Sequence, residues 1–554
     1  MTLRVRVRLM WHVAAAVFAT ALHLAACEGC RSTPASRQPT ATTLGSNVGS
    51  PTARLILLTD VAGALEPCGC TKDQLGGVGH FGAWVKRERV PGVVAAAGPV
   101  FFMDSQLDPQ KADQDRAKAD AIARVLAQLD FVAFAPGRND WSGGTDLLLS
   151  LARESGAAAI VDSSSKDPPM ALSVVREVPG TALRIGFVGY GQPSGSEPTE
   201  NVEATIRRGA EQARSGGANV LIALAAVGRG EAKRIADAVP ELTAVVVGSV
   251  KSDGDANAAA PEAERIGDVL IAQSGNHLQS ALVLDLYVRE SPQRGRILRF
   301  EDGTGAELAS RKHDLVSRID ELHRKIAAWE RDPGVSAADL EARRRDLARL
   351  EGESVALEAT PTAVTGSFLR YRLQEIRESL GQDPKIDEEL LDYYKMVDEH
   401  NRREFAHRLP PAPAPGVATY VGVDVCASCH AAARRVWDGT GHSRAYAMLS
   451  AQFKEFNLDC VSCHVTGYEK PGGSTVTHVE RLRNVQCEVC HGPGSKHVEA
   501  PEDDAAIVAR PAPSLCLGCH HPPHVDEFDP EAKMKQILGP GHGLASSSSS
   551  SEAR

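Results

Sequence analysis

Cys487-Glu488-Val489-Cys490-His491 is one of four Cys-x-x-Cys-His motifs that decide the fold of the C-terminal region. The others are Cys426-Ala427-Ser428-Cys429-His430, Cys460-Val461-Ser462-Cys463-His464 and Cys516-Leu517-Gly518-Cys519-His520. In this motif two thiols attach a haem covalently and the histidine binds the iron from one side. Zinc ribbons also pair Cys-x-x-Cys motifs, but they need no histidine after each second cysteine. The sequence therefore predicts four c-type haems, with His430, His464, His491 and His520 as proximal iron ligands.

Such closely spaced haems must form much of the interior of residues 420–543. Aliphatic residues are scarce there, so we expect a mainly α, haem-packed domain. Haems this close to one another exchange electrons. The domain is therefore expected to transfer electrons. It could act as an enzyme only if one haem iron keeps a free coordination position.

The N-terminus has the features of a secretory signal, because Arg4, Arg6 and Arg8 precede an apolar run from Leu9 to Ala26. Its end, Leu24-Ala25-Ala26-Cys27, resembles a bacterial lipobox, in which Cys27 would carry lipid. An ordinary signal peptide with a chance cysteine is the alternative. We expect a lipid-anchored protein of the bacterial cell envelope that faces the periplasm or the cell exterior.

The formal net charge of −10 and the lack of a dense basic tract make nucleic acid an improbable partner. Redox proteins of the cell envelope are the expected partners. Cys30, Cys68 and Cys70 lie outside the haem motifs. They could ligate a metal, exchange electrons with a haem, form a disulfide or stay unpaired.

Apolar runs alternate with helical patterns from residue 54 to residue 300, which predicts an α/β domain with buried sheets. Strands are expected at Leu55–Leu58, Val93–Ala97, Phe131–Phe134, Ile185–Val188, Val220–Leu224 and Ala244–Val247. Helices are expected at Lys111–Leu129 and Val202–Ser215.

Residues 301–409 change character. Apolar residues recur at helical spacing on both sides of Asp332-Pro333-Gly334, which favours a helical hairpin over a long dimerising coiled coil. A further helix is expected from about Leu373 to Arg408. The predicted parts are a signal peptide (1–26), a tether (27–53), the α/β domain (54–300), a helical hairpin and linker (301–409), a Pro-rich spacer (410–419), the haem domain (420–543) and a disordered tail (544–554).

Residues 420 to about 524 resemble the tetrahaem cytochrome c of ammonia oxidisers, the electron acceptor of hydroxylamine oxidoreductase. The matching stretches are Tyr420-Val421-Gly422, Trp437 with Thr440-Gly441-His442, Cys460 to Tyr468, and Val485 to His497. The resemblance implies an electron carrier with mostly bis-histidine haems. Related proteins have one five-coordinate haem, which raises chemistry on a small nitrogen compound as an alternative.

Distal iron ligands are expected among the other histidines of this region. The resemblance implies His442 and His497, and His524, His478 and His542 are further candidates. His521 adjoins a proximal ligand and is expected to face solvent. Met448 and Met534 are also candidates, although methionines on helices more often serve packing.

Residues 54–290 resemble the metallophosphoesterases of the 5′-nucleotidase kind. The resemblance lies in Leu58-Thr59-Asp60-Val61-Ala62-Gly63, Glu66-Pro67-Cys68-Gly69-Cys70 and Gly76-Gly77-Val78-Gly79. It implies a sandwich of two sheets flanked by helices, with two metals bound at strand ends. Most ligand positions hold other residues, namely Ala62, Gly98-Pro99, Gly137-Arg138-Asn139-Asp140, Ala226 and Gly248-Ser249-Val250-Lys251.

Asp60 is the one expected metal ligand still in place, a vestige of the family's site. One carboxylate cannot hold two hard cations, so no functional dinuclear centre is expected. The sequence thus favours an electron carrier with a non-catalytic docking domain. The alternatives are a haem enzyme and a metal-dependent phosphoesterase fused to a cytochrome.

Overall fold

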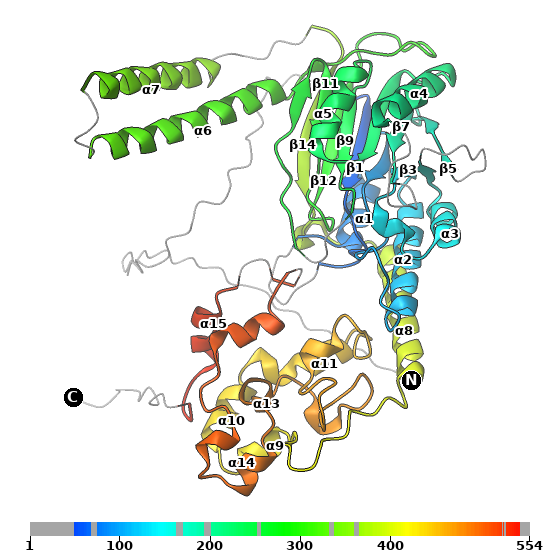
Figure 1. Cartoon of the computed structure of the whole chain (residues 1–554). Helices are drawn as coiled ribbons and strands as arrows, with labels where there is room; N and C mark the ends of the chain where they lie inside the picture. The colour runs from blue at the N-terminus through cyan, green and yellow to red at the C-terminus, as the bar shows by residue number, and fades with distance from the viewer. Residues whose placement is uncertain are drawn as a thin grey trace, which may run out of the picture. The chain divides into compact units, whose positions relative to one another are not determined.

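The computed structural model describes residues 49–67, 75–161, 170–192, 201–251, 256–331, 337–358, 365–522, 524–525 and 528–542 (Figure 1). The predicted signal peptide, most of the tether and the tail lie outside the described residues, as do Cys27, Cys30, Cys68 and Cys70. Within the described ranges, no helix has the length and apolar character that crossing a membrane requires.

Two sheets form the centre of the α/β domain. The first has the order β13-β14-β12-β1-β2-β3-β4-β5 and consists of β1 (Ala53–Thr59), β2 (Gly92–Ala97), β3 (Phe131–Ala135), β4 (Ala158–Ile160), β5 (Met170–Ala171), β12 (Ser280–Tyr287), β13 (Glu301–Asp302) and β14 (Phe368–Glu375). The second has the order β10-β11-β9-β8-β7-β6 and consists of β6 (Ser173–Glu177), β7 (Arg184–Tyr190), β8 (Val220–Ala226), β9 (Ala244–Gly248), β10 (Glu264–Ile266) and β11 (Val269–Ala272). All six predicted strands lie within these elements.

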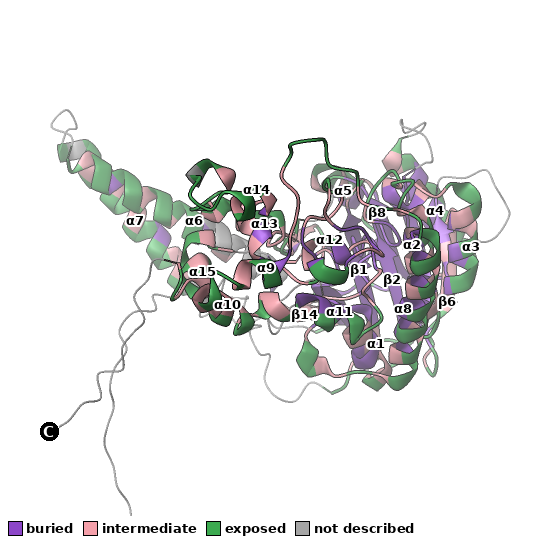
Figure 2. Cartoon of the chain, turned by 90° about the horizontal axis from the view of Figure 1, so that it is seen from below, coloured by how far each residue is buried: buried purple, intermediate pink, exposed green. Residues whose placement is uncertain are grey.

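The sheets pack face to face, and helices cover both outer faces. Successive side chains of a strand point to opposite faces. In β1, Leu55 and Leu57 therefore join the core between the sheets, whereas Ile56 and Leu58 pack towards the helices. Burying such a side chain contributes about 1.5–3 kcal/mol. The buried residues accordingly gather in the sheets (Figure 2).

The first sheet is covered by α1 (Val78–Arg87), α2 (Ala112–Ala127), α3 (Thr145–Ser155) and α8 (Pro384–Glu404), and the second by α4 (Val202–Ser215) and α5 (Arg229–Ala238). The predicted α/β sandwich is thus confirmed. The helix expected at Val202–Ser215 has the predicted bounds, and α2 lies within the other predicted helix.

Residues 368–375 correct the prediction of a purely helical linker. They form strand β14, which pairs with β12 across its whole length. Leu369, Tyr371 and Leu373 point towards the core between the sheets and alternate with Arg370 and Arg372, which is the two-residue period of a half-buried strand. The strand completes the first sheet.

Helix α8 begins later than predicted, because Pro384 suits a first turn and Asp383 caps it by accepting from the backbone of Lys385 and Ile386. Its buried residues Ile386, Leu390, Tyr393, Tyr394 and Val397 belong to the same core as the outer face of the first sheet. The α/β domain therefore extends to α8.

The predicted helical hairpin consists of α6 (Ala306–Trp329) and α7 (Ala337–Glu358). Arg344 pairs with Glu330 at 2.7 Å and His323 lies 3.4 Å from Glu351, so charged side chains connect the two helices.

The C-terminal region contains short helices and loops, and its described residues show isolated β-bridges in place of strands. The α-helices are α9 (Val423–Ala427), α10 (Ala431–Asp438), α11 (Ala445–Ser450), α12 (Val461–His464), α13 (Cys487–His491), α14 (Ser495–Glu499) and α15 (Pro530–Ile537). Its apolar cluster is small, with Phe405, Tyr446, Val461, Val465, Val476 and Val479 as the buried members. This agrees with the predicted mainly α domain.

Candidate functional site

The attachment motifs lie on single helical turns. Cys426 is on α9, Cys463 and His464 are on α12, the whole third motif is α13, and Cys516 is in the 3₁₀ helix Pro513–Gly518. Residues three apart on a helix share one face. Both cysteines of a motif could therefore attach to one haem, and the histidine is the next residue along the chain.

The four motifs form two neighbouring pairs. The thiols of Cys426 and Cys487 lie near enough to shift each other's pKa, upwards for Cys426 and downwards for Cys487, so the first motif is close to the third. In the same way Cys519 lowers the pKa of Cys463 and Cys463 raises that of Cys519, so the second motif is close to the fourth. Groups attached at paired motifs would be close neighbours.

A buried glutamate holds the first and third motifs together. The Glu488 carboxylate accepts hydrogen bonds of 2.8 Å from the backbone N–H groups of Val421, Gly422 and Gly494. Glu488 is 2% exposed. The stretch 485–497, which carries the resemblance to the ammonia oxidiser cytochrome, thus fixes the chain that leads into the first motif.

Two of the predicted proximal histidines are oriented by backbone carbonyls. His464 Nδ1 lies 2.6 Å from Ala445 O, and His491 Nδ1 lies 2.7 Å from Val508 O. A protonated Nδ1 that donates to a carbonyl leaves Nε2 as the metal-binding nitrogen. Both side chains therefore fit a role as iron ligands.

Two further histidines lie opposite proximal ones. The ring centres of His430 and His497 are 6.1 Å apart, and those of His442 and His520 are 6.2 Å apart. A metal–imidazole bond is about 2 Å long, so two imidazoles on opposite sides of one ion have ring centres about 6 Å apart. Burial lowers the pKa of His442, which favours the neutral form that binds metals.

His542 lies near a third proximal histidine. Burial, then the nearby His491 and His430, lower its pKa. His542 and His497 each have a buried Nδ1 without a hydrogen-bond partner among the described residues. A buried polar atom is normally satisfied, so these nitrogens also fit a metal.

The remaining candidates lie elsewhere. His478 Nδ1 is bonded to the hydroxyl of Thr477 at 3.1 Å, and His521 packs against His524 with ring centres 5.7 Å apart. Met448 is 53% exposed. Within the described part of the chain, ring contacts join His430 and His520, but neither His464 nor His491, to a second histidine. His491 has His542 nearby, so the second motif is the one for which no second histidine is found among the described residues.

The ends of the sandwich strands form the second candidate site, here called the strand-end site. Asp60 follows β1 and is 5% exposed. Its Oδ1 accepts from Ser249 N at 2.7 Å, and its Oδ2 accepts from Ser249 Oγ at 2.9 Å. Burial raises the pKa of Asp60 to about 6, and the hydrogen bonds from Ser249 and Gln273 oppose this rise. Both oxygens of the Asp60 carboxylate thus already accept hydrogen bonds from protein groups.

Asp140 has a structural role that the sequence did not reveal. Its carboxylate accepts from the backbone N–H groups of Val100 (2.9 Å), Phe101 (2.8 Å) and Gly137 (3.1 Å). Burial raises its pKa to about 7, against the effect of these bonds. Asp140 therefore ties the loop after β2 to the loop after β3.

The strand-end site offers few metal donors. Among the described residues, no group of three or more His, Cys, Asp or Glu side chains is placed to hold a metal ion. Gln192 Nε2 donates to the backbone carbonyl of Ala226 at 2.7 Å, and Ala226 is the residue at which the sequence resemblance implies a histidine. His277, in the turn before β12, is buried, and its Nδ1 lies 2.9 Å from Asn257 Oδ1. Protein groups thus satisfy one another at the ends of these strands.

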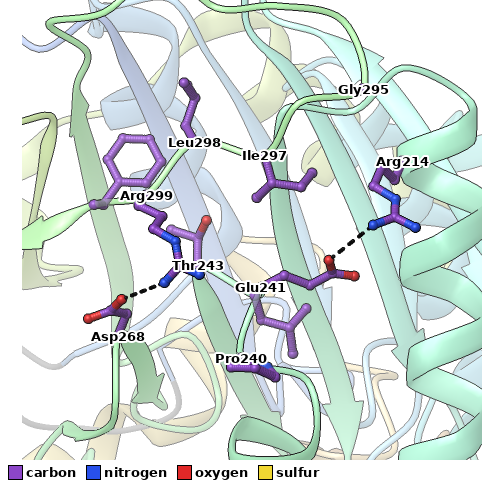
Figure 3. Close-up of a pocket in the computed structure, with 11 residues that line it drawn as sticks. Arg214, Pro240, Glu241, Thr243, Asp268, Gly295, Ile297, Leu298 and Arg299 are labelled. Atoms are coloured by element: carbon purple, nitrogen blue, oxygen red, sulfur yellow. Dashed lines mark hydrogen bonds and ion pairs between the residues drawn. The ribbon is translucent and has the colours of Figure 1, made fainter.

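A pocket of about 250 Å³ lies at the end of the second sheet that is opposite to the strand-end site (Figure 3). Thr243 and Asp268 come directly before β9 and β11, so the pocket is at the amino ends of these strands. Ligands of α/β sheets bind at the carboxyl ends. Its ion pairs, Arg214 with Glu241 and Arg299 with Asp268, already satisfy its charges.

Asp60→Asn is expected to stabilise the protein above pH 6. An amide can still accept from Ser249 N and can donate to Ser249 Oγ, but it carries no charge to bury. The pKa of Asp60 in the folded state lies above the unfolded value of 3.8. The wild type therefore loses stability as the pH rises from 4 to 6, where the folded protein has to bury the charged carboxylate. The variant should gain about 2 kcal/mol at pH 8 and almost nothing at pH 4 in denaturant titrations. A loss of stability at pH 8 would contradict this account of the site.

Comparison with known proteins finds similarity between the C-terminal region and cytochromes. Residues 425–492 match the family model described as cytochrome c554 and c-prime. Cytochrome c-554 of Nitrosomonas europaea is 34% identical over 93 residues, which cover 14% of this chain and 40% of that protein. The region is thus similar in sequence to a haem protein, as its motifs predict.

Solved structures similar to the chain include a 5′-nucleotidase precursor from Thermus thermophilus, with 15% identity and a TM-score of 0.39 over 65% of this chain and 61% of that one. Sulfate thiohydrolase SoxB of Thermus thermophilus, in complex with glycerol, has 14% identity and a TM-score of 0.35 over 43% of this chain and 54% of that one. The chain spans less than two thirds of either structure.

Proposed function

We propose that the protein is a membrane-anchored tetrahaem c-type cytochrome that transfers electrons between redox proteins of the cell envelope. Bound haem iron would supply one-electron redox chemistry. The chain's own residues would hold the four groups close together through two neighbouring pairs of motifs. The match of residues 425–492 to cytochrome c554 and c-prime supports this function.

The histidine pairs carry the proposal. His430 with His497 and His442 with His520 have the spacing of two axial ligands, and His542 lies near His491. We infer that these pairs hold the first, fourth and third haems. Six-coordinate iron has no position left for substrate, so these haems would only carry electrons.

A reductive titration tests this function. The matured protein should take up four electrons per chain in reversible one-electron steps, and a reduced sample should pass them to an oxidised soluble cytochrome. Uptake of fewer than four electrons, or reduction that cannot be reversed, would contradict the proposal.

A haem enzyme is the second candidate, and the second motif favours it. His464 has its Nδ1 bonded to a carbonyl but no described histidine opposite it. A haem there would have one open position, where a small nitrogen compound could bind. Carbon monoxide binding to the ferrous protein decides between the candidates, because a fully six-coordinate protein would not bind it.

We further propose that the α/β domain is a docking domain without hydrolytic activity. Its strand-end site is filled by the hydrogen bonds of Asp60, Ser249 and Gln192. Among the described residues, these bonds leave no set of free donors for two cations.

The lipid on Cys27 is likewise a proposal, supported by the junction 24–27 at the end of an apolar run. Cys27→Ser is expected to move the protein from the membrane fraction to the soluble fraction, because Cys27 would be the residue to which the lipid anchor is attached. Retention of the variant on membranes after a salt wash would show that another anchor holds it.

A further inference from the structure

A partly buried polar cluster joins the α/β domain to the second haem-attachment motif. Its charged centre is Asp459, the residue before Cys460, and it is called the Asp459 cluster below. Lys118 Nζ, on α2, donates to Asp459 Oδ2 at 2.7 Å, and Lys111, directly before α2, pairs with Asp459 Oδ1. Gln114 Nε2 lies 3.2 Å from the same carboxylate.

Neutral side chains of the cluster fix the backbone before the motif. Gln114 is 2% exposed, and its Oε1 accepts from Leu458 N and from Asn401 Nδ2, both at 2.9 Å. Asn401, near the end of α8, also donates to Phe456 O at 2.9 Å. Two helices of the α/β domain thus hold residues 456–458 directly.

This hold extends into the motif itself. Asn457 O accepts from Cys460 N at 3.0 Å and from Val461 N at 2.9 Å, at the start of α12. Val461 is fully buried and packs in one cluster with Phe405, the residue that follows α8. The placement of Cys460, Cys463 and His464 therefore depends on α2 and α8.

The cluster also places charges beside the attachment point. Although burial disfavours the charged form, Lys118 and Lys111 hold the pKa of Asp459 below its ordinary value. The Asp459 side chain is 29% exposed and that of Lys118 is 18% exposed. Solvent and salt screen such partly buried charges much less than surface charges. The charges of Asp459, Lys118 and Lys111 can therefore interact electrostatically with a haem attached at Cys460.

We propose that the Asp459 cluster positions the second haem and sets its reduction potential, so that the α/β domain controls electron transfer at that haem. The inference rests on the proposed cytochrome function. On reduction the haem iron gains one electron from its redox partner, and no bond is made or broken. A nearby anion disfavours that gain, and a nearby cation favours it.

Opposite charge changes provide the test. Lys118→Met should lower the midpoint potential of one haem, and Asp459→Asn should raise it. We expect each change to alter the equilibrium constant for reduction about tenfold, which is 59 mV for a one-electron couple. Lys118→Arg keeps the charge and should restore the wild-type potential. Lys533→Met, an exposed change on α15, is the matched control and should alter nothing.

The measurement is a potentiometric titration of the full, haem-loaded chain followed by electron paramagnetic resonance, which separates the individual haems. Shifts of the same sign for Lys118→Met and Asp459→Asn, or no shift of any haem, would overturn the proposal. If Lys118→Met does not accumulate, Lys111→Met removes a more exposed charge of the same cluster and should also lower the potential. A chain that attaches no haem would overturn the cytochrome function instead, so the two failures are distinguishable.

Discussion

His497→Ala is expected to convert one low-spin haem into a high-spin haem, and His442→Ala should do the same to a different haem. Each substitution removes the imidazole that lies about 6 Å, centre to centre, from a proximal histidine. Loss of this strong-field ligand leaves the iron five-coordinate or bound to water. The midpoint potential of the affected haem should rise, because the donor that stabilises the ferric form is gone.

Electronic and paramagnetic spectra of the ferric protein measure this change. A low-spin signal should disappear and a high-spin signal of equal intensity should replace it. His521→Ala serves as the control, because His521 packs against His524 and its Nδ1 lies 2.6 Å from Pro522 O. Unchanged spectra for both variants would remove the two assignments, and a change in the control would show that any loss of histidine disturbs the region.

The second large expectation is an absence of phosphoesterase turnover. Hydrolysis in such a site requires a metal-activated water and a clamp on the phosphoryl oxygens. Ala62, Pro99, Ala226 and Ser249 stand where the sequence resemblance implies metal ligands, and Asp60 is held by Ser249. Addition of manganese, zinc or cobalt should therefore give no activity against nucleotides or a chromogenic phosphodiester.

The assay is informative in either direction. An authentic 5′-nucleotidase under the same conditions shows that the metals and substrates are adequate. Metal-dependent turnover that Asp60→Ala abolishes would mean that the lost ligands are wrongly aligned. It would also favour the fused phosphoesterase over the electron carrier.

Much of the sandwich was predictable because its strands are continuous apolar runs. Val220–Ala226 and Ala244–Gly248 are buried along their whole length, and such segments have few alternatives to a central strand. The strand β14 does carry a two-residue period, in which arginines alternate with inward apolar residues, but the helix predicted from about Leu373 overlaps its end. Its pairing with β12 is a tertiary contact that a local pattern does not contain.

The candidate sites were predictable to different degrees. The attachment motifs are local, so spacing alone located them. The pairs His430–His497 and His442–His520 join residues far apart in the chain, and the family resemblance named His497 and His442 without their partners. The roles of Asp140, Glu488 and Asp459 depend on backbone groups or charges brought in by folding, which no motif signals.

Intact mass of the protein, matured in a host with working cytochrome assembly, tests the central claim most directly. The account predicts an increase over the processed polypeptide equal to four haem groups, which persists under denaturing conditions because the links are covalent. Replacement of Cys460 and Cys463 by alanine should remove one of the four. A mass without covalent haem, or zinc in place of iron, would contradict the account.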